Sequence, residues 1–454
     1  MLDLTPKTHV NRSGVLINPC KTCQPVGALF AALGVRNCMP YSHGSQGCAS
    51  YHRTYLTRHF KEPAIAVTSS FTEGACVFGG GPNIRQGVKT AFEVYNPDII
   101  AVHTTCLSET IGDDLKTYID DMEIPDDKIV VHCNTPSYVG SHVTGFANMM
   151  AGFINYLAAK GKATETVAVF PGFVNPGDIR EYKHLVNLMK LKSIMFPDCS
   201  NVMDAPMTGE YKMYPDGGTT VEEIRALGSC RKVLALGRLT SEEPAAQLKR
   251  KCGVDFDLLP LPIGLADTDA FIMAMANLNG GEVDPLIDEE RGRLLDLMLD
   301  ANPYFYGKKV AVYGDPDTVL GMTRFCLELG MIPKYVLTGT PGETFVKLAK
   351  AMFKEYGKEE ECKAFAAKDL FDLHQFIKEE PVDLLLGNSH GKQIAKAENI
   401  PLVRAGFPIL DRYGHGSLPI VGYRGAFQLA TKIADTLMEE FDRNCADEDM
   451  DLIM

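Results

Sequence analysis

The sequence lacks the features that would place the chain in a membrane or direct it out of the cell. No apolar run approaches the roughly 20 residues that a membrane-spanning helix requires, and short runs such as Leu384–Leu386 are typical of buried strands. The opening residues MLDLTPKTHV contain no apolar core like that of a secretory signal. We therefore expect a soluble, cytoplasmic protein with no membrane partner.

Nucleotide-binding motifs are also missing. Gly387–Lys392 comes nearest to a phosphate-binding loop, but its spacing is wrong and the final hydroxyl is absent. Gly79–Gly81 forms no dinucleotide fingerprint, and no Ser/His/Asp set stands out at nucleophile-elbow spacing. The net charge of −13 argues against nucleic acid as a partner. We expect a chain that neither hydrolyses ATP nor binds nucleic acid.

The composition and the order of predicted elements favour an α/β protein. The 454 residues are 45% hydrophobic and 23% charged, which is ordinary for a globular chain. Short apolar strands alternate with helical patterns, and this predicts parallel sheets covered on both faces. The pattern restarts along the chain and predicts three doubly wound αβα domains, at residues 1–162, 163–304 and 305–454, the last closed by a long helix. The predicted strands cover residues 98–103, 128–132, 166–170, 232–236, 308–313, 334–337, 382–386 and 401–404.

Thirteen cysteines are many for a chain of this length, and the number is odd. Disulfides are not expected in the cytoplasm, so the thiols are buried small hydrophobes, metal ligands or nucleophiles. For any one cysteine taken alone, burial in the core is the more common role. Position along the chain must therefore identify the functional cysteines.

Three cysteines and one serine are candidate ligands, and two of the four lie on loops beyond the carboxyl ends of predicted strands, where ligands of a parallel sheet are expected. Cys106 follows the strand predicted at 98–103, and Ser137 follows the one predicted at 128–132. Cys48 lies in a glycine-containing loop that a bulky group could approach, and Cys23 lies in a stretch with no predicted structure. Three thiols on separate loops are iron–sulfur candidates. A self-contained cluster takes four ligands, so either Ser137 or another chain would complete the set.

Cys20 and Cys23 form a C-x-x-C pair, which by itself suggests a zinc knuckle or a redox dithiol. The second half of a zinc site is missing, and the pair lies between prolines rather than between a strand and a helix. We therefore interpret Cys20 as incidental.

Several segments of the sequence form long motifs and together span nearly the whole chain. They are Cys23–Ala28, His43–Cys48, Arg58–Pro63, Thr104–Asp114, Thr135–Gly145, Phe170–Phe173, Arg291–Arg293, Gly314–Asp317, Arg404–Pro408 and Asp411–Arg412. These segments resemble the β subunit of nitrogenase component I, the molybdenum–iron protein or dinitrogenase. The N-terminus resembles the compact form of that subunit.

The resemblance implies the component I fold and an α2β2 nitrogenase heterotetramer that reduces dinitrogen to ammonia. The family's P-cluster, an eight-iron seven-sulfur centre, is shared between α and β subunits, and each gives three cysteines. Here these map onto Cys23, Cys48 and Cys106, with Cys48 in the bridging position. Ser137 maps onto the serine that joins iron on oxidation. The chain would relay electrons through this cluster to the iron–molybdenum cofactor in the α subunit.

Two further sites follow from the resemblance. Phe78 maps onto the docking surface for the transient partner, the ATP-hydrolysing iron protein, although a phenylalanine before glycines is more often a core residue. A Ca²⁺ or Fe²⁺ site between two β subunits maps onto the backbone oxygen of Lys61 and the carboxylates of Glu62, Asp296 and Asp300. Without the resemblance, these carboxylates would be interpreted as a solvated surface.

Alternatives remain at this point. Within the family, the chain could be a β-type subunit of a vanadium or iron-only nitrogenase, or of the cofactor-assembly scaffold. Ser45 and Phe71–Gly74 look more like the molybdenum form, and the retained cysteine set argues against the scaffold. Outside the family, the alternative is a non-catalytic α/β binding protein. Other histidines, such as His184 and His374, lie on helical patterns and are expected at the surface.

Overall fold

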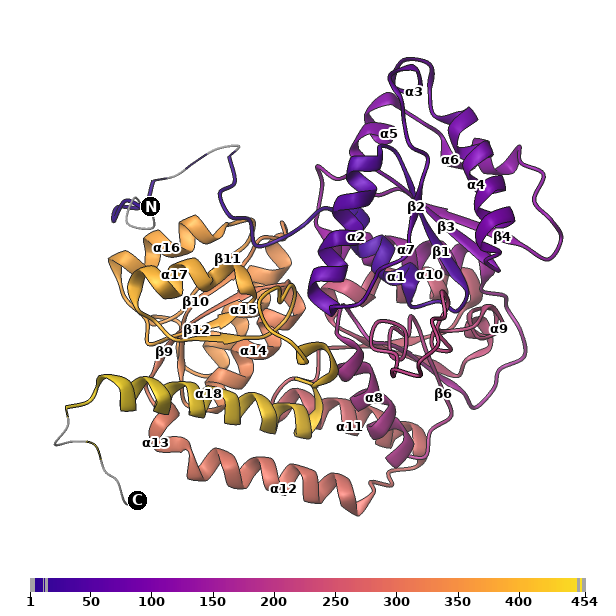
Figure 1. The fold of residues 1–454 in the computed structure, drawn as a ribbon. Helices are drawn as coiled ribbons and strands as arrows, with labels where there is room; N and C mark the ends of the chain where they lie inside the picture. The colour runs from indigo at the N-terminus through magenta and orange to yellow at the C-terminus, as the bar shows by residue number, and fades with distance from the viewer. Residues whose placement is uncertain (1–4, 11, 13–14, 447–449, 451–454) are drawn as a thin grey trace.

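In the computed structural model, which describes residues 5–10, 12, 15–446 and 450, the strands form three parallel sheets (Figure 1). Every strand pairing within them is parallel, with helices in the crossovers. The predicted α/β fold is therefore confirmed. The predicted domain boundaries near residues 162 and 305 fall between the sheets and stay a prediction.

Strand order in each sheet reverses near its middle, which is the doubly wound pattern. The first sheet has the order β2-β1-β3-β4, with β1 (Cys38–His43), β2 (Val67–Thr68), β3 (Ile99–Thr104) and β4 (Ile129–Cys133). The second has the order β6-β5-β7-β8, with β5 (Val167–Phe170), β6 (Ser193–Met195), β7 (Lys232–Leu236) and β8 (Phe256–Leu259). The third has the order β11-β10-β9-β12-β13, with β9 (Lys309–Gly314), β10 (Ile332–Thr338), β11 (Lys363–Phe365), β12 (Leu384–Gly387) and β13 (Leu402–Arg404).

Central strands formed where the sequence predicts them because their apolar runs are buried on both faces. All six residues of β3 are buried, as expected for a strand between two helical layers. Strands β1, β2, β6, β8 and β11 were not predicted. They are short, or carry polar residues and proline, as in the CMPYSH sequence of β1, yet every residue of β1 is buried.

Helix α1 (Gln24–Leu33) is buried along its whole length and crosses α7 (His142–Leu157) closely. A Cβ atom at Gly27 would lie 1.7 Å from the His142 carbonyl oxygen, and one at Gly145 would lie 1.9 Å from the Gln24 carbonyl oxygen. Only glycine permits this approach at both positions. The crossing fixes the start of α1, and with it Cys23, against the first sheet. It also lies in one apolar core that includes residues from all three sheets.

The remaining helices cover the sheets. They are α2 (Gln46–Phe60), α3 (Glu73–Phe78), α4 (Gly81–Tyr95), α5 (Cys106–Ile111), α6 (Leu115–Asp120), α8 (Pro176–Leu188), α9 (Val221–Ala226), α10 (Arg238–Cys252), α11 (Ala266–Asn279), α12 (Pro285–Asp300), α13 (Asn302–Phe305), α14 (Pro316–Glu328), α15 (Glu343–Glu355), α16 (Leu370–Glu379), α17 (Lys392–Glu398) and α18 (Gly422–Asn444).

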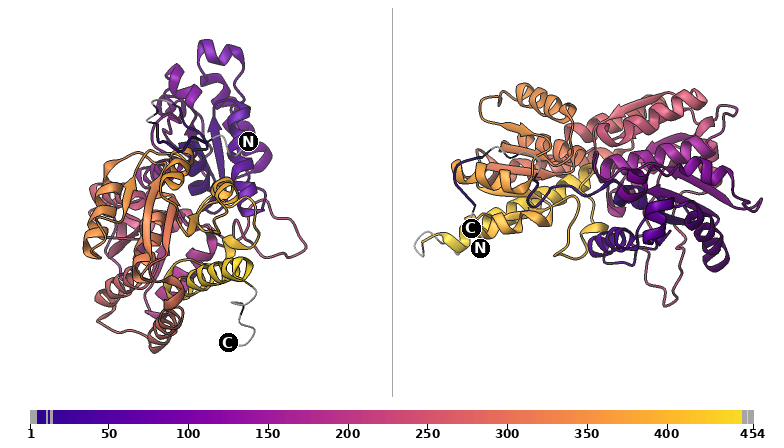
Figure 2. Two further views of the ribbon diagram at one scale, coloured as in Figure 1. Left: turned by 90° about the vertical axis from the view of Figure 1, so that its left-hand side faces the viewer. Right: turned by 90° about the horizontal axis from the view of Figure 1, so that it is seen from above.

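Both ends of the chain tie the sheets together (Figures 1 and 2). The closing helix α18 packs against α12 and α8, which flank the second sheet, as well as against β13 of the third. Near the N-terminus, Arg12 pairs with Asp369 at 2.8 Å, so residues preceding Cys23 lie on the third sheet's helices. No helix in the described part of the chain is long and apolar enough to cross a membrane.

Candidate metal centre

Cys23 lies at the N-terminus of α1, as the residue that caps it. No helix was predicted here, yet α1 begins at the next residue, Gln24, with Pro25 in its first turn. The thiol is half-buried, and burial raises its pKa to about 11. Its sulfur lies 3.5 Å from Nε2 of His52.

Cys48 lies in the first turn of α2, just beyond the carboxyl end of β1. Gly44, between strand and helix, has a φ of +158°. A Cβ atom there would lie 2.0 Å from Oγ1 of Thr105, the residue that precedes Cys106. Glycine is therefore needed for the two cysteine-bearing loops to approach each other.

Cys106 is the first residue of α5, directly after β3, as predicted. Thr105 and Ser108 cap this helix reciprocally, and the Ser108 hydroxyl also donates to the His43 carbonyl at 2.8 Å. Partial burial, followed by the neighbouring Cys48 thiol, raises the pKa of Cys106. The Cys48 thiol is thus near enough to Cys106 to act on its pKa, and the structure brings the two cysteines to the same place.

Ser137 lies in a turn that follows β4 and is half-buried. Gln24, the residue after Cys23, donates its side-chain amide to the carbonyls of Pro136 and Val139, at 3.1 and 2.9 Å. These bonds hold the turn beside the start of α1. The four candidate ligands thus lie at the starts of α1, α2 and α5 and in the turn after β4, around the carboxyl edge of the first sheet, where ligands of such sheets bind.

The accessibility of the cysteines separates these three from most of the others. All thirteen are free thiols in the structure. Cys106 is exposed, and Cys23, Cys48, Cys76 and Cys445 are partly exposed. The rest are buried: Cys20, Cys38, Cys133, Cys199, Cys230, Cys252, Cys326 and Cys362. Cys23, Cys48 and Cys106 are thus three accessible thiols at the carboxyl edge of the first sheet, which we call the thiol edge.

Cys20 does not join this group. It is fully buried against the third sheet, where the Asn388 side chain donates to its sulfur at 3.8 Å. The C-x-x-C pair therefore spans two environments, one in the core and one at the sheet edge.

Phe78 is the last residue of α3 and is 88% exposed, so the core interpretation is wrong for it. Its neighbour Val77 is 73% exposed. Helix α3 packs against α5, whose first residue is Cys106. Helix α3 therefore exposes an apolar pair beside the thiol edge.

The four residues of the predicted cation site lie in two places. Lys61 ends α2 with a left-handed backbone, φ +67°, and the exposed Glu62 follows it. Asp296 and Asp300 are exposed one turn apart on α12. Among the described residues, no metal-binding group forms from these carboxylates within the chain. A site made of all four residues would need a second copy of the chain.

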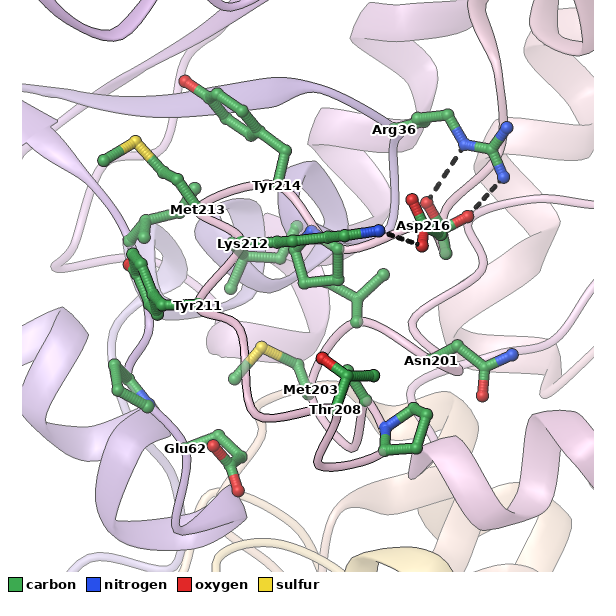
Figure 3. Close-up of a pocket in the computed structure, with 18 of the residues that line it drawn as sticks. Arg36, Glu62, Asn201, Met203, Thr208, Tyr211, Lys212, Met213, Tyr214 and Asp216 are labelled. Atoms are coloured by element: carbon green, nitrogen blue, oxygen red, sulfur yellow. Dashed lines mark hydrogen bonds and ion pairs between the residues drawn. The ribbon is translucent and has the colours of Figure 1, made fainter.

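A hollow of about 670 Å³ lies next to Glu62, under the loop of residues 201–217 (Figure 3). Met203, Met213 and Tyr214 line it, and the Lys212–Asp216 ion pair (2.7 Å) lies at one side. None of the three candidate thiols is among its lining residues. The hollow is therefore separate from the thiol edge.

Within the described part of the chain, three side chains with metal-binding atoms meet at the junction of α8, α12 and α18. They are Glu181, His184 and Glu290. Arg424 already forms an ion pair with Glu181, and His184 bonds to Glu290 at 2.8 Å. The two carboxylates are thus paired by side chains of the protein itself.

Both histidines predicted to lie at the surface have structural partners instead. His184 is half-buried in that group, and His374 is 6% exposed and bonds to Glu398 at 2.6 Å. The prediction was wrong for His374. Its helix turns this position towards Glu398 on α17, a direction that the helical pattern alone did not show.

The fold and this site match one class of proteins. A family model described as nitrogenase component 1 type oxidoreductase matches residues 23–438, and the chain belongs to that family. Membership implies metal clusters, which the accessible thiols fit.

More particularly, the chain is similar to nitrogenase molybdenum-iron protein beta chains. It is 57% identical to that of Clostridium pasteurianum over 458 aligned residues, with 100% of both chains covered. It is 39% identical to that of Methanothermobacter marburgensis, with 96% of this chain and 98% of the relative covered. Those relatives are beta chains, which implies a complex with an alpha partner.

Solved structures agree. One described as nitrogenase Cp1 at pH 6.5 has a TM-score of 0.98 and 57% identity, with 100% of both chains covered. Another, nitrogenase Cp1 at pH 5, has a TM-score of 0.71 at 15% identity, covering 97% of this chain and 92% of that one, and shows a shared fold alone.

Proposed function

We propose that this chain is the β subunit of a molybdenum nitrogenase component I. In an α2β2 complex it relays electrons from the ATP-hydrolysing iron protein to the iron–molybdenum cofactor of the α subunit, where dinitrogen is reduced to ammonia. The observation that carries the proposal is the edge of accessible thiols in a chain that matches a molybdenum–iron protein beta chain from end to end.

The chain's own part in this reaction is to hold and shield half of a cluster. Cys23, Cys48 and Cys106 would ligate it, with Ser137 as a further oxygen ligand after oxidation. The P-cluster supplies one-electron transfer when bound. Because burial and the neighbouring thiol raise the pKa values of Cys23 and Cys106, these thiols release protons when they bind metal.

Partner binding would use two further surfaces. Phe78 and Val77 present apolar area beside the thiol edge, and the iron protein would dock there. Glu62 and the Lys61 carbonyl of one β subunit would face Asp296 and Asp300 of a second, around Ca²⁺ or Fe²⁺. Oxygen-only ligands of this kind suit a hard cation.

Co-expression with and without the α partner tests the proposal. We expect the purified complex to be brown, to contain iron and molybdenum, and to show a reducible cluster spectrum, and the chain expressed alone to lack the cluster. Vanadium, or an absence of molybdenum, would favour a β subunit of an alternative nitrogenase. A colourless complex without iron would instead favour a non-catalytic binding protein.

A further inference from the structure

His52 lies beneath the thiol edge, and two elements determine its position. It is four residues after Cys48 on α2, so the two side chains share one helix face. Its ring is 2% exposed, and its Nε2 lies 3.5 Å from the sulfur of Cys23. His52 therefore connects the helix that carries one candidate ligand to the sulfur of another.

The contact with Cys23 is the hydrogen bond available to this ring. Nδ1 is buried and has no hydrogen-bond partner in the described part of the chain. The rings of Tyr51 and His103 lie near the His52 ring, each with its centroid 6.1 Å away. A neutral imidazole carries one N–H, and a buried N–H without an acceptor is rare and costly. The proton is therefore best placed on Nε2, facing sulfur.

Ligation strengthens this assignment. A cysteine that binds metal does so as a thiolate, which has no S–H to donate. The bond between Cys23 and His52 can then run in one direction only, from Nε2–H to sulfur.

We infer that His52 donates a hydrogen bond to the Cys23 sulfur and thereby raises the reduction potential of the cluster that Cys23 holds. The inference rests on the proposed function, which makes Cys23 a ligand. Added electrons increase the negative charge on the ligand sulfurs, and an N–H donor stabilises that charge. The proton stays on His52, so no proton transfer is involved. His52 is a positioning and tuning residue that does not ligate the metal.

The test compares His52→Phe with His52→Gln in the purified α–β complex, with iron counted and the cluster's midpoint potential measured by spectroscopic titration. Phenylalanine fills similar space without a donor, whereas the glutamine amide can place an N–H near the position of Nε2. We expect a more negative potential in His52→Phe, so that the ratio of reduced to oxidised cluster at the wild-type midpoint falls at least about threefold. His52→Gln should recover at least half of the shift.

His103→Gln is the matched control. His103 is buried beside His52, but its Nε2 bonds to the Ser42 hydroxyl at 2.8 Å and not to a cysteine. We expect the cluster in the His103→Gln complex to have the same midpoint potential as in the wild type, within error. A shift in His103→Gln as large as that in His52→Phe would overturn the inference, because any change in this layer would then suffice.

The remaining outcomes are also decisive. An unchanged potential in a His52→Phe complex with its full iron content would overturn the inference and leave the proposed function standing. A wild-type complex without iron would overturn both. If the His52→Phe complex loses its iron, pulsed EPR of ¹⁵N-histidine-labelled wild-type and His52→Gln complexes replaces the potential measurement. A coupling between the cluster and a histidine nitrogen that is present in the wild type and absent from His52→Gln supports the hydrogen bond from His52 to Cys23. The absence of this coupling from the wild type overturns the inference.

Discussion

Nε2 of His43 lies 2.9 Å from a carboxylate oxygen of Asp113, and both side chains are almost fully buried. His43 ends β1, before the loop that leads to Cys48, and Asp113 follows α5, the helix that begins with Cys106. Asp113 also accepts the backbone N–H of Gly80, two residues after Phe78. This one carboxylate therefore ties together two of the ligand-bearing segments and the exposed helix beside them.

Removing the Asp113 carboxylate should destabilise the fold at the carboxyl edge of the first sheet. Asp113→Ala leaves the His43 ring, the Gly80 N–H and the Tyr118 hydroxyl without their partner in a buried site. We expect a loss of roughly 3 kcal/mol in unfolding free energy, measured by denaturant titration. The exposed Asp127→Ala serves as the control and should stay within about 0.5 kcal/mol of the wild type. Equal stability of the two variants would contradict the network described above.

Cys106→Ala should remove the cluster without unfolding the chain. The residue is exposed at the start of a short helix, so the substitution opens no core cavity. Iron per complex and dinitrogen reduction should fall to background, while the thermal unfolding profile of the separately expressed chain stays unchanged. The control is Cys445→Ala, which replaces a partly exposed cysteine near the other end of the chain. The complex with this variant should keep its iron. Full activity in Cys106→Ala would refute the ligand assignment.

Phe78→Ala should weaken docking of the iron protein and leave stability unaffected. The side chain is 88% exposed, so its removal costs little in folding, whereas aromatic residues often dominate binding energy at interfaces. We expect an apparent dissociation constant at least about tenfold higher, which corresponds to roughly 1.4 kcal/mol. The control is Phe441→Ala, which removes a 60% exposed phenylalanine on α18 and should bind the iron protein as the wild type does. If both variants show the same dissociation constant for the iron protein, Phe78 is not part of the docking surface.

His59 should make stability depend on pH. Its Nδ1 accepts the Ile409 N–H and its Nε2 donates to Asn175, each at 2.8 Å, so the folded chain holds it neutral. Burial, with the nearby His415 as a further cause, lowers its pKa to about 3, against about 6.5 in an unfolded chain.

Between those two pKa values only the unfolded state binds the proton, so stability falls as pH drops from about 6.5 towards 3, by up to about 1.4 kcal/mol per pH unit from this one group. Denaturation midpoints at pH 7.5, 6.0 and 5.0 measure this. His59→Gln should be less stable at pH 7.5 but should lose less stability on acidification. A variant whose midpoints decline in parallel with those of the wild type would show that His59 does not titrate as described.

The candidate site divides into parts that the sequence could and could not predict. Cys106 was predicted after β3 because an apolar strand followed by a polar loop is visible in the residues themselves. The helix start at Cys23 was missed, although Pro25 was a signal for it. Strand β1 was missed because its CMPYSH sequence becomes a buried strand only through packing. Nothing in the sequence indicated the contact between His52 and Cys23.

Alternation of apolar strands and helical patterns determined the α/β fold, because burial on both faces of a parallel sheet requires it. The same sequence supplied candidate ligands and, by resemblance, their proposed roles. Only the tertiary structure decided that Cys48 and Cys106 are neighbours, that Phe78 is exposed and that His52 faces the Cys23 sulfur. These relationships join residues on different elements, and helical crossovers and glycine-permitted approaches set their distances, which no local pattern in the chain records.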